Sequence, residues 1–80
     1  NEPVGSHLLR FARLPDICDI SIYTISGEFV DKFTHNNPYD GNEWWDLKNQ
    51  LGEFIAPGLY IYVVETPGGE TLIGKFAVVR

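Results

Sequence analysis

The stretch APGLYIYVVE, residues 56–65, decides the fold of this chain. Pro57 fixes its own φ and Gly58 frees the backbone after it, so the pair sets a corner from which an extended segment leaves. Segment 59–65 is then apolar on both faces, with two tyrosines among aliphatic residues. A strand that is apolar on both faces belongs in the interior of a sheet. We therefore expect a central strand here, with one side on the core and the other partly covered by tyrosine rings.

Alternation of apolar and polar residues predicts the strands that precede this central strand. In HLLRFARL (7–14), Leu9 and Phe11 share one face, and Pro15 ends the pairing because it has no N–H to donate, which favours an edge position. In CDISIYTI (18–25), apolar residues alternate with Asp, Ser and Tyr, the pattern of a strand with one solvated face. Gly27 supplies the turn to a returning strand, GEFVDKFTH (27–35), whose irregular apolar spacing indicates a β-bulge.

The remaining segments follow from turn signals. NNPYDGN (36–42) is the densest of these and predicts a loop, after which EWWDL (43–47) resumes as a strand with Trp45 and Leu47 on one face. KNQLGEF (48–54) is typical of a loop or a single helical turn closed by Gly52, and residues 54–55 are expected to form a very short strand. TPGGE (66–70) predicts a hairpin turn that contains Gly69. TLIGKFAVVR (71–80) then returns beside 59–65, with Gly74 weakening the ladder or marking a bulge.

These segments predict an all-β fold. Six or seven short strands without a sustained helical pattern favour an Ig-like, fibronectin III-like antiparallel β-sandwich. A chain of 80 residues has room for one such domain, which we place at 7–80 after a lead-in at 1–6. The turns are expected to depend on Gly27, Gly58 and Gly69. The core is expected to contain Phe11, Leu14, Ile20, Ile22, Val30, Trp45, Leu47, Tyr60, Tyr62 and Phe76.

Composition excludes several classes of function. The net charge is −5 and the six Lys and Arg residues are dispersed, whereas binding to phosphate backbones requires clustered cations, so no nucleic-acid partner is expected. No apolar run approaches the about 20 residues of a membrane-spanning helix. The one cysteine, Cys18, has no internal disulfide partner and is expected to be a buried small hydrophobe. The chain contains no methionine, which indicates a mature or excised piece of a longer product.

Taken in order, the motifs RFARLP, DISIYTISGEFV, WDLKNQLGEFIAPGLYIYVVE and GKFAVVR resemble a known group of domains. They are similar to the Ig-like or fibronectin-like C-terminal domains of many secreted bacterial proteins. These include the Ig-like domain of the flagellar hook-capping protein and the C-terminal sorting domains of type IX secretion. The resemblance covers residues 9–80. It implies a secreted or cell-surface location and, for the sorting members, recognition by a secretion machinery followed by cleavage or anchoring.

The residues offer little for catalysis. His7 and Ser6 are neighbours, and neighbours on an extended strand point to opposite faces, so they do not form a nucleophile–base pair. His35 precedes a polar loop and is expected to be solvated. The carboxylates in segment 36–46 are of the kind that binds calcium, but their spacing matches no EF-hand loop, and a solvated acidic loop is the simpler account. No catalytic residue, metal ligand or cofactor is therefore expected, and calcium binding at 36–46 is left open.

The leading functional hypothesis is a non-enzymatic C-terminal Ig-like module of a secreted or cell-surface bacterial protein. It would act in export or sorting, surface anchoring or assembly, with protein partners such as secretion or surface machinery, neighbouring domains or subunits. An exposed edge, such as the first strand or GKFAVVR, can add to a partner sheet, which makes Gly74, Lys75 and Arg80 candidate interaction residues. One alternative is a carbohydrate-binding module that holds glycans on Trp44 and Tyr39. Another is a subunit of an extracellular filament.

Overall fold

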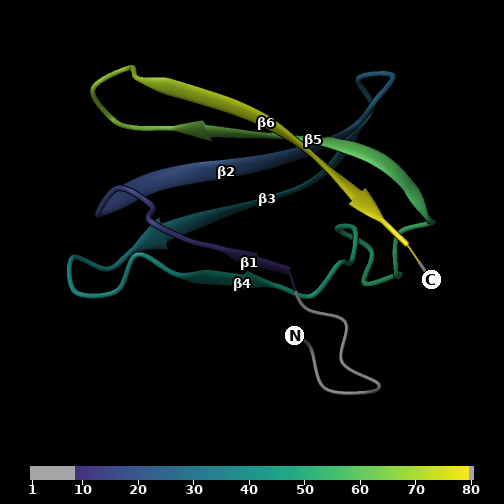
Figure 1. The fold of residues 1–80 in the computed structure, drawn as a ribbon, viewed down its shortest axis with the longest axis horizontal. Coiled ribbons are helices and arrows are strands. Elements are labelled where there is room, and N and C mark those ends of the chain that lie inside the picture. The colour runs from purple at the N-terminus through teal and green to yellow at the C-terminus, as the bar shows by residue number, and fades with distance from the viewer. Residues whose placement is uncertain (1–8, 80) are drawn as a thin grey trace.

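The computed structural model describes residues 9–79 of the 80-residue chain. In that range it has six strands and no helix: β1 (Leu9–Phe11), β2 (Ile17–Thr24), β3 (Phe29–Asn36), β4 (Glu43–Trp45), β5 (Gly58–Glu65) and β6 (Thr71–Val78). They form two antiparallel sheets, one in the order β3-β2-β5-β6 and one in the order β1-β4 (Figure 1). The predicted antiparallel β-sandwich is confirmed. Across residues 9–79 there is also no helix that could span a membrane.

The central strand of the larger sheet is β5, as the stretch 56–65 predicts. It lies between β2 and β6, and its register pairs Tyr62 with Ile22 on one side and with Gly74 on the other. Tyr60 and Val64 are buried on the inner face, and the Tyr62 ring meets Phe11 of the opposite sheet edge to face. The expectation that tyrosine rings cover the outer face is therefore wrong, because alternation places both rings in phase with Val64 on the core side.

The predicted β-bulge lies between β2 and β3. Ile22 pairs with Asp31, whereas the next residue, Tyr23, pairs with Phe29, so Val30 is the extra residue. Val30 is buried, and Asp31 shares the inner face with its partner Ile22. Because the bulge shifts the alternation by one position, Phe29 returns to the outer face and packs on the Tyr23 ring.

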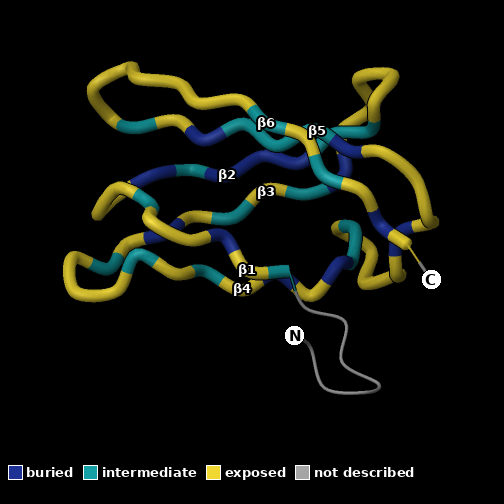
Figure 2. The backbone as a smooth tube through the Cα atoms, viewed as in Figure 1, coloured by how far each residue is buried: buried dark blue, intermediate teal, exposed yellow. Residues whose placement is uncertain are grey.

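The core lies between the two sheets (Figure 2). Of the residues expected there, seven are buried and three are half-buried against the same cluster; the three are Leu14, Tyr62 and Phe76. Six aromatic rings form its centre. The Phe33 ring contacts the rings of Phe11 and Trp45. The Phe11 ring also contacts Tyr62, and the Phe76 ring contacts Trp45, Tyr60 and Tyr62. The cluster also contains Cys18, which was expected to be buried, and three apolar residues that the sequence patterns did not place there: Ile55, Val64 and Val78.

A hydrogen bond closes the corner that precedes β5. The Tyr60 hydroxyl donates to the carbonyl oxygen of Ala56 at 2.6 Å. In Ig-type sandwiches a tyrosine near the start of strand F makes this kind of bond to the backbone a few residues upstream, and strands C′, C, F and G form one sheet. With β5 as strand F, the order β3-β2-β5-β6 matches that sheet. The residues PGLY (57–60) contain this signal, although turn preferences alone predict only a corner there.

Three local expectations need correction. Residues 54–55 form no strand; Phe54 makes an isolated bridge to Lys48 across a tight loop, in which the Asn49 side-chain oxygen accepts the N–H groups of Leu51 and Glu53. Gly74 marks no bulge either, because β6 pairs with β5 without interruption from residue 71 to 78. The predicted strand at 7–14 is reduced to residues 9–11 in the described range, since Arg13 has a left-handed φ of 58° that ends the extended conformation.

Candidate functional site: a groove beside the edge of β1

The two sheets differ in size, which leaves part of the inner face uncovered. β1 and β4 have 3 residues each, whereas each strand of the larger sheet has 8. β1 pairs with β4 along one edge, and its other edge has no strand partner within residues 9–79. On the facing sheet, Leu72 is paired with the buried Val64, so its side chain shares the inner face, yet it is 61% exposed.

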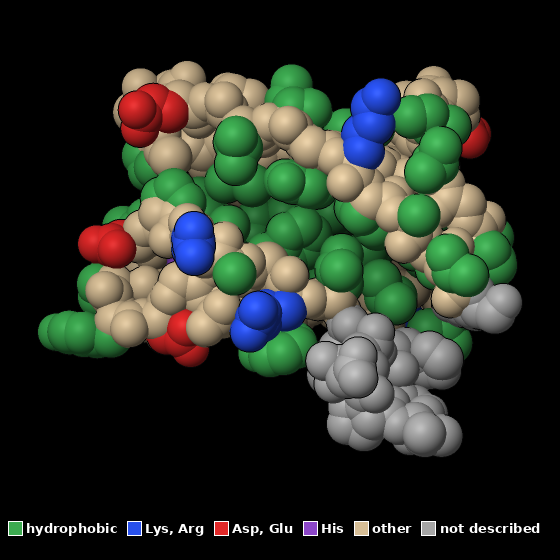
Figure 3. All heavy atoms as spheres, in the orientation of Figure 1, with side chains coloured by type: hydrophobic (Ala, Val, Ile, Leu, Met, Phe, Trp, Pro, Cys, Tyr) green, Lys and Arg blue, Asp and Glu red, His purple; other side chains and the backbone are tan. Residues whose placement is uncertain are grey.

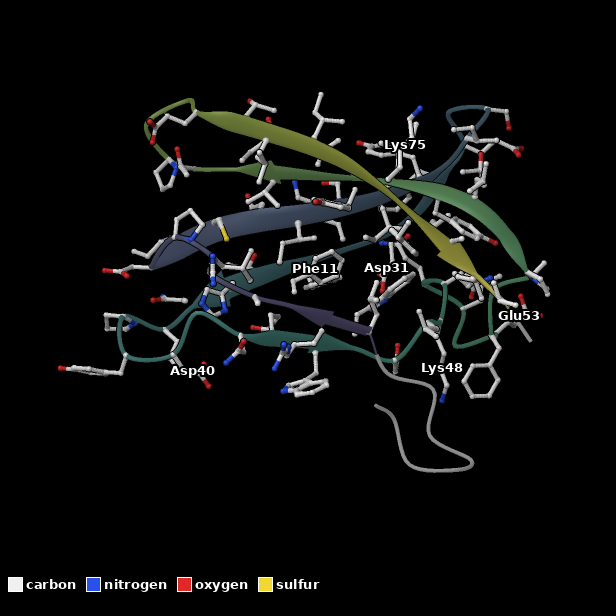
Figure 4. The ribbon with its side chains drawn as sticks, viewed as in Figure 1. Phe11, Asp31, Asp40, Lys48, Glu53 and Lys75 are labelled. Carbon is white, nitrogen blue, oxygen red and sulfur yellow. The ribbon has the colours of Figure 1, made fainter. Side chains whose placement is uncertain are left out.

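A groove of about 220 Å³ occupies this position. One wall is segment 9–15, which comprises β1 and the loop after it, and the floor is formed by Tyr62, Val64, Leu72 and Phe76 of β5 and β6. Apolar side chains line a hollow on this face of the molecule (Figure 3), and Phe11 extends from β1 into the space between the sheets (Figure 4). The groove is thus an apolar slot with a strand edge along one side.

Gly74 determines the shape of the floor. A Cβ atom at this position would overlap the ring of Tyr62, which lies directly opposite on β5. The glycine therefore lets the tyrosine ring lie against the β6 backbone, an arrangement in which an aromatic side chain covers a glycine of an edge strand. Gly74 thus has a steric role, and its predicted weakening of the ladder stays a prediction.

Two arginines provide the charge of the groove. Arg10 and Arg13 are the charged residues among those lining it, and no carboxylate of the described residues forms a salt bridge with either. The guanidinium of Arg10 lies 6.0 Å from the centroid of the Trp44 ring. Arg13 is in the left-handed region, a conformation that costs a bulky residue about 1 kcal/mol. The next residue fixes this loop, since Leu14 N–H donates to the Gly41 carbonyl at 2.9 Å.

The prediction that His35 is solvated is wrong, because the residue is buried and only 1% exposed. Its Nδ1 lies 2.9 Å from Oε1 of Glu43, so this hydrogen bond joins β3 of one sheet to β4 of the other. The signal was present in the sequence, because two-residue alternation places His35 on the same face as the core residue Phe33. Its Nε2 has no hydrogen-bond partner within the described part of the chain.

The acidic residues of segment 36–46 do not converge. Glu43 turns towards His35, Asp40 accepts two hydrogen bonds from Asn42, and Asp46 accepts the N–H of Lys48 at 3.2 Å. Residues 9–79 contain no group of three or more His, Cys, Asp or Glu side chains placed to hold a metal ion. Asp40 and Asp46 thus act as local caps for backbone N–H groups, whereas Glu43 is the partner of His35.

The predicted interaction residues are dispersed over the surface. Tyr39 is 96% exposed in the loop before β4, and Trp44 is 56% exposed with Arg10 against its ring. Lys75 is exposed on the outer face of β6, in register with Ile61. Arg80 lies outside the described residues, as do Ser6 and His7. Neither aromatic ring lines the groove, and glycan binding by them stays a prediction.

Cys18 is buried, as expected of a small hydrophobe. Burial, with a further contribution from the negative charges of Asp19 and Glu43, raises the pKa of the Cys18 thiol. A raised thiol pKa keeps the sulfur protonated and unreactive at neutral pH.

The fold and the groove define a small antiparallel β-sandwich domain with one partly uncovered inner face. No protein-family model matches the chain, and no curated protein does. Among solved structures it is similar to a part of PorZ, an essential bacterial surface component of the type IX secretion system of Porphyromonas gingivalis. The TM-score is 0.73 at 22% sequence identity, over 89% of this chain and 9% of the PorZ chain. The chain thus has the fold of a small portion of that protein.

Proposed function

We propose that this chain is a non-enzymatic C-terminal module of a secreted or cell-surface bacterial protein. It acts in export or sorting, surface anchoring or assembly, and its partners are proteins that recognise its strand edges and surface. The observation that carries this proposal is the likeness to PorZ, which extends over 89% of the chain. The ordered motifs that resemble type IX sorting domains support it independently, because they come from the sequence alone.

The side chains that could perform chemistry support a role without catalysis. His35 and Cys18 are each 1% exposed, so neither reaches a substrate from solvent. The groove contains apolar residues and two arginines but no described acid, base and nucleophile together. A surface with a free strand edge and apolar side chains is instead suited to protein recognition.

Surface display of a reporter tests the proposal. The chain is fused to the C-terminus of a periplasmic reporter protein in a bacterium that has a type IX secretion system. We expect the reporter on the cell surface with the complete chain and its retention in the periplasm when residues 74–80 are deleted. Equal display of the two fusions, or no display of the complete one, would contradict the proposal.

A folded variant is needed because the deletion also removes core residues, Phe76 and Val78. The double variant Lys75→Glu with Val79→Glu changes two exposed side chains of the last strand and its end. We expect this variant to keep its circular dichroism spectrum and to lower display. Full display by it would place recognition elsewhere on the module, and the deletion result would then report loss of folding only.

A further inference from the structure

We propose that the groove between β1 and β6 binds an extended strand of a partner protein, in which apolar residues alternate with acidic ones. The strand adds to the free edge of β1. This inference rests on the proposed function, since it adds a second recognised surface to that of the last strand and names the partner chemistry that this second surface takes.

The edge of β1 offers the main-chain groups for such pairing. Within residues 9–79, β1 has β4 on one side only. An edge strand presents unpaired N–H and C=O groups, and addition of a strand is a common way in which a sheet edge binds a peptide. Pairing with β1 is short, because the strand has 3 residues and the left-handed Arg13 follows closely.

The floor of the groove offers the apolar contacts. A strand beside β1 points every second side chain towards the facing sheet. There it meets the exposed Leu72 and the half-buried Tyr62 and Phe76. The edges of β3 and β6 are also free of further strands in the described range. Two further hollows of the surface contain carboxylates, however: Glu53 lines one, and Asp19 and Glu65 line the other.

The charge of the groove selects the partner. Arg10 is exposed on the face of β1 opposite Phe11, so an acidic residue on an added strand lies across from it. Arg13 extends the positive charge along the same wall. A second copy of this chain pairing through β1 would bring its own Arg10 and Arg13 to the same edge, and like charges directly opposite are destabilising. The apolar floor and the arginine wall together specify a strand with apolar residues facing inward and acidic residues facing outward.

Binding of a synthetic peptide tests this inference. The probe is a blocked seven-residue peptide of alternating valine and glutamate, and its matched control has lysine at each glutamate position. Titration of the complete, isotope-labelled chain is followed by the NMR signals of its backbone amides and methyl groups. We expect the glutamate peptide to shift the amides of residues 9–11 and the methyl groups of Leu72, and to bind roughly tenfold more tightly than the lysine peptide.

A charge-reversed variant provides a second test of the proposed groove. In the double variant Arg10→Glu with Arg13→Glu, both changes are on exposed side chains, so the fold is retained and is checked by circular dichroism. We expect this variant to prefer the lysine peptide. In Leu72→Asp, also at an exposed position, we expect binding of both peptides to weaken.

Several outcomes would overturn the inference. The first is equal binding of the two peptides, and the second is a set of NMR shifts confined to β3 or to the outer face of β6. The third is contact, in the peptide-free chain, between Leu72 and residues that precede Leu9, because the groove would then be occupied by its own chain. A dimer that dissociates on charge reversal would do the same, because a second copy would be the occupant. In the display assay, the fusion with Arg10→Glu and Arg13→Glu is compared with the unaltered fusion. If both were fully displayed, the proposed function would stand, but the groove would be rejected as its recognition site.

Discussion

The indole Nε1–H of Trp45 donates a 3.0 Å hydrogen bond to Oδ2 of Asp31, which links the small sheet to the large one. Trp45 is 3% exposed, and Asp31 lies on the inner face because it continues the alternation of His35 and Phe33 and pairs with the buried Ile22. We expect Trp45→Phe to lower the free energy of unfolding by about 1–3 kcal/mol, because it removes this bond and part of the ring packing and leaves Asp31 without its donor. Urea denaturation followed by circular dichroism measures the change. The matched control is Trp44→Phe, whose exposed ring is expected to contribute less than about 0.5 kcal/mol; equal losses for the two variants would contradict this view of the interface.

The corner hydrogen bond of Tyr60 gives a second prediction. Tyr60→Phe keeps the ring, which stacks on Phe76, and removes the hydroxyl that donates to Ala56. We expect a loss of about 1–1.5 kcal/mol in the free energy of unfolding. Tyr39→Phe serves as the control, since that side chain is 96% exposed. An unchanged unfolding midpoint for Tyr60→Phe would show that the corner does not depend on its hydroxyl.

The third prediction concerns Gly74, where the expected effect of alanine on stability is opposite to the one that strand propensity gives. Alanine normally stabilises a strand relative to glycine, but at position 74 its Cβ would overlap the Tyr62 ring. We expect Gly74→Ala to destabilise the chain by about 1–3 kcal/mol, through displacement of that ring. In Gly68→Ala the new Cβ meets no atom closer than 3.9 Å, so little change is expected.

A double-mutant cycle identifies the cause. Tyr62→Leu removes the ring that Gly74 accommodates, and in that background Gly74→Ala should cost much less than in the native chain. Additive losses would indicate that the alanine acts on the β6 backbone and not on the tyrosine.

The pair of His35 and Glu43 gives a fourth prediction. Glu43→Ala leaves the buried ring without its partner at Nδ1, which is expected to lower the free energy of unfolding by about 1–3 kcal/mol. Glu43→Gln keeps an acceptor oxygen and should recover a part of that loss. Thermal unfolding of both variants measures the difference. If alanine and glutamine were equally destabilising, the hydrogen bond would not explain the burial of His35.

The raised pKa of Cys18 predicts a dependence on alkaline pH. The thiol has an ordinary pKa of about 9.0 in the unfolded chain and a higher one when folded, so the folded state holds the proton more tightly. Its contribution to stability is complete below about pH 9 and is lost as the pH rises towards the folded pKa. We expect the native chain to lose more stability than Cys18→Val between pH 8 and about pH 10.5 in matched denaturation curves. Parallel curves over that interval would exclude ionisation of this thiol as the cause.

The separation of inner and outer residues was largely predictable. Where one face of a strand is buried, period-two alternation identifies that face, which is why Trp45 and Trp44 were assigned to the correct sides. The same rule, applied to β3, would have placed His35 inside with Phe33. The prediction instead followed the polarity of the loop after it, and a buried hydrogen-bond partner 8 residues away is not visible in a local pattern.

The groove was beyond the reach of the sequence. Its wall comes from segment 9–15 and its floor from strands that begin at residues 58 and 71. Neither segment alone shows that the small sheet is too short to cover the large one. The free edge of β1 was predicted, but the arginines gained significance only from the apolar floor opposite them.

The amino-acid sequence by itself determined the strands, their turns and the central position of β5, since these depend on alternation and on backbone preferences of glycine and proline over a few residues. Only the tertiary structure decided which inner side chains stay exposed, that Gly74 lies beneath Tyr62, and that His35 meets Glu43. The physical reason is that these relations depend on the register and extent of strands distant in the chain, which are set by how the two sheets pack together.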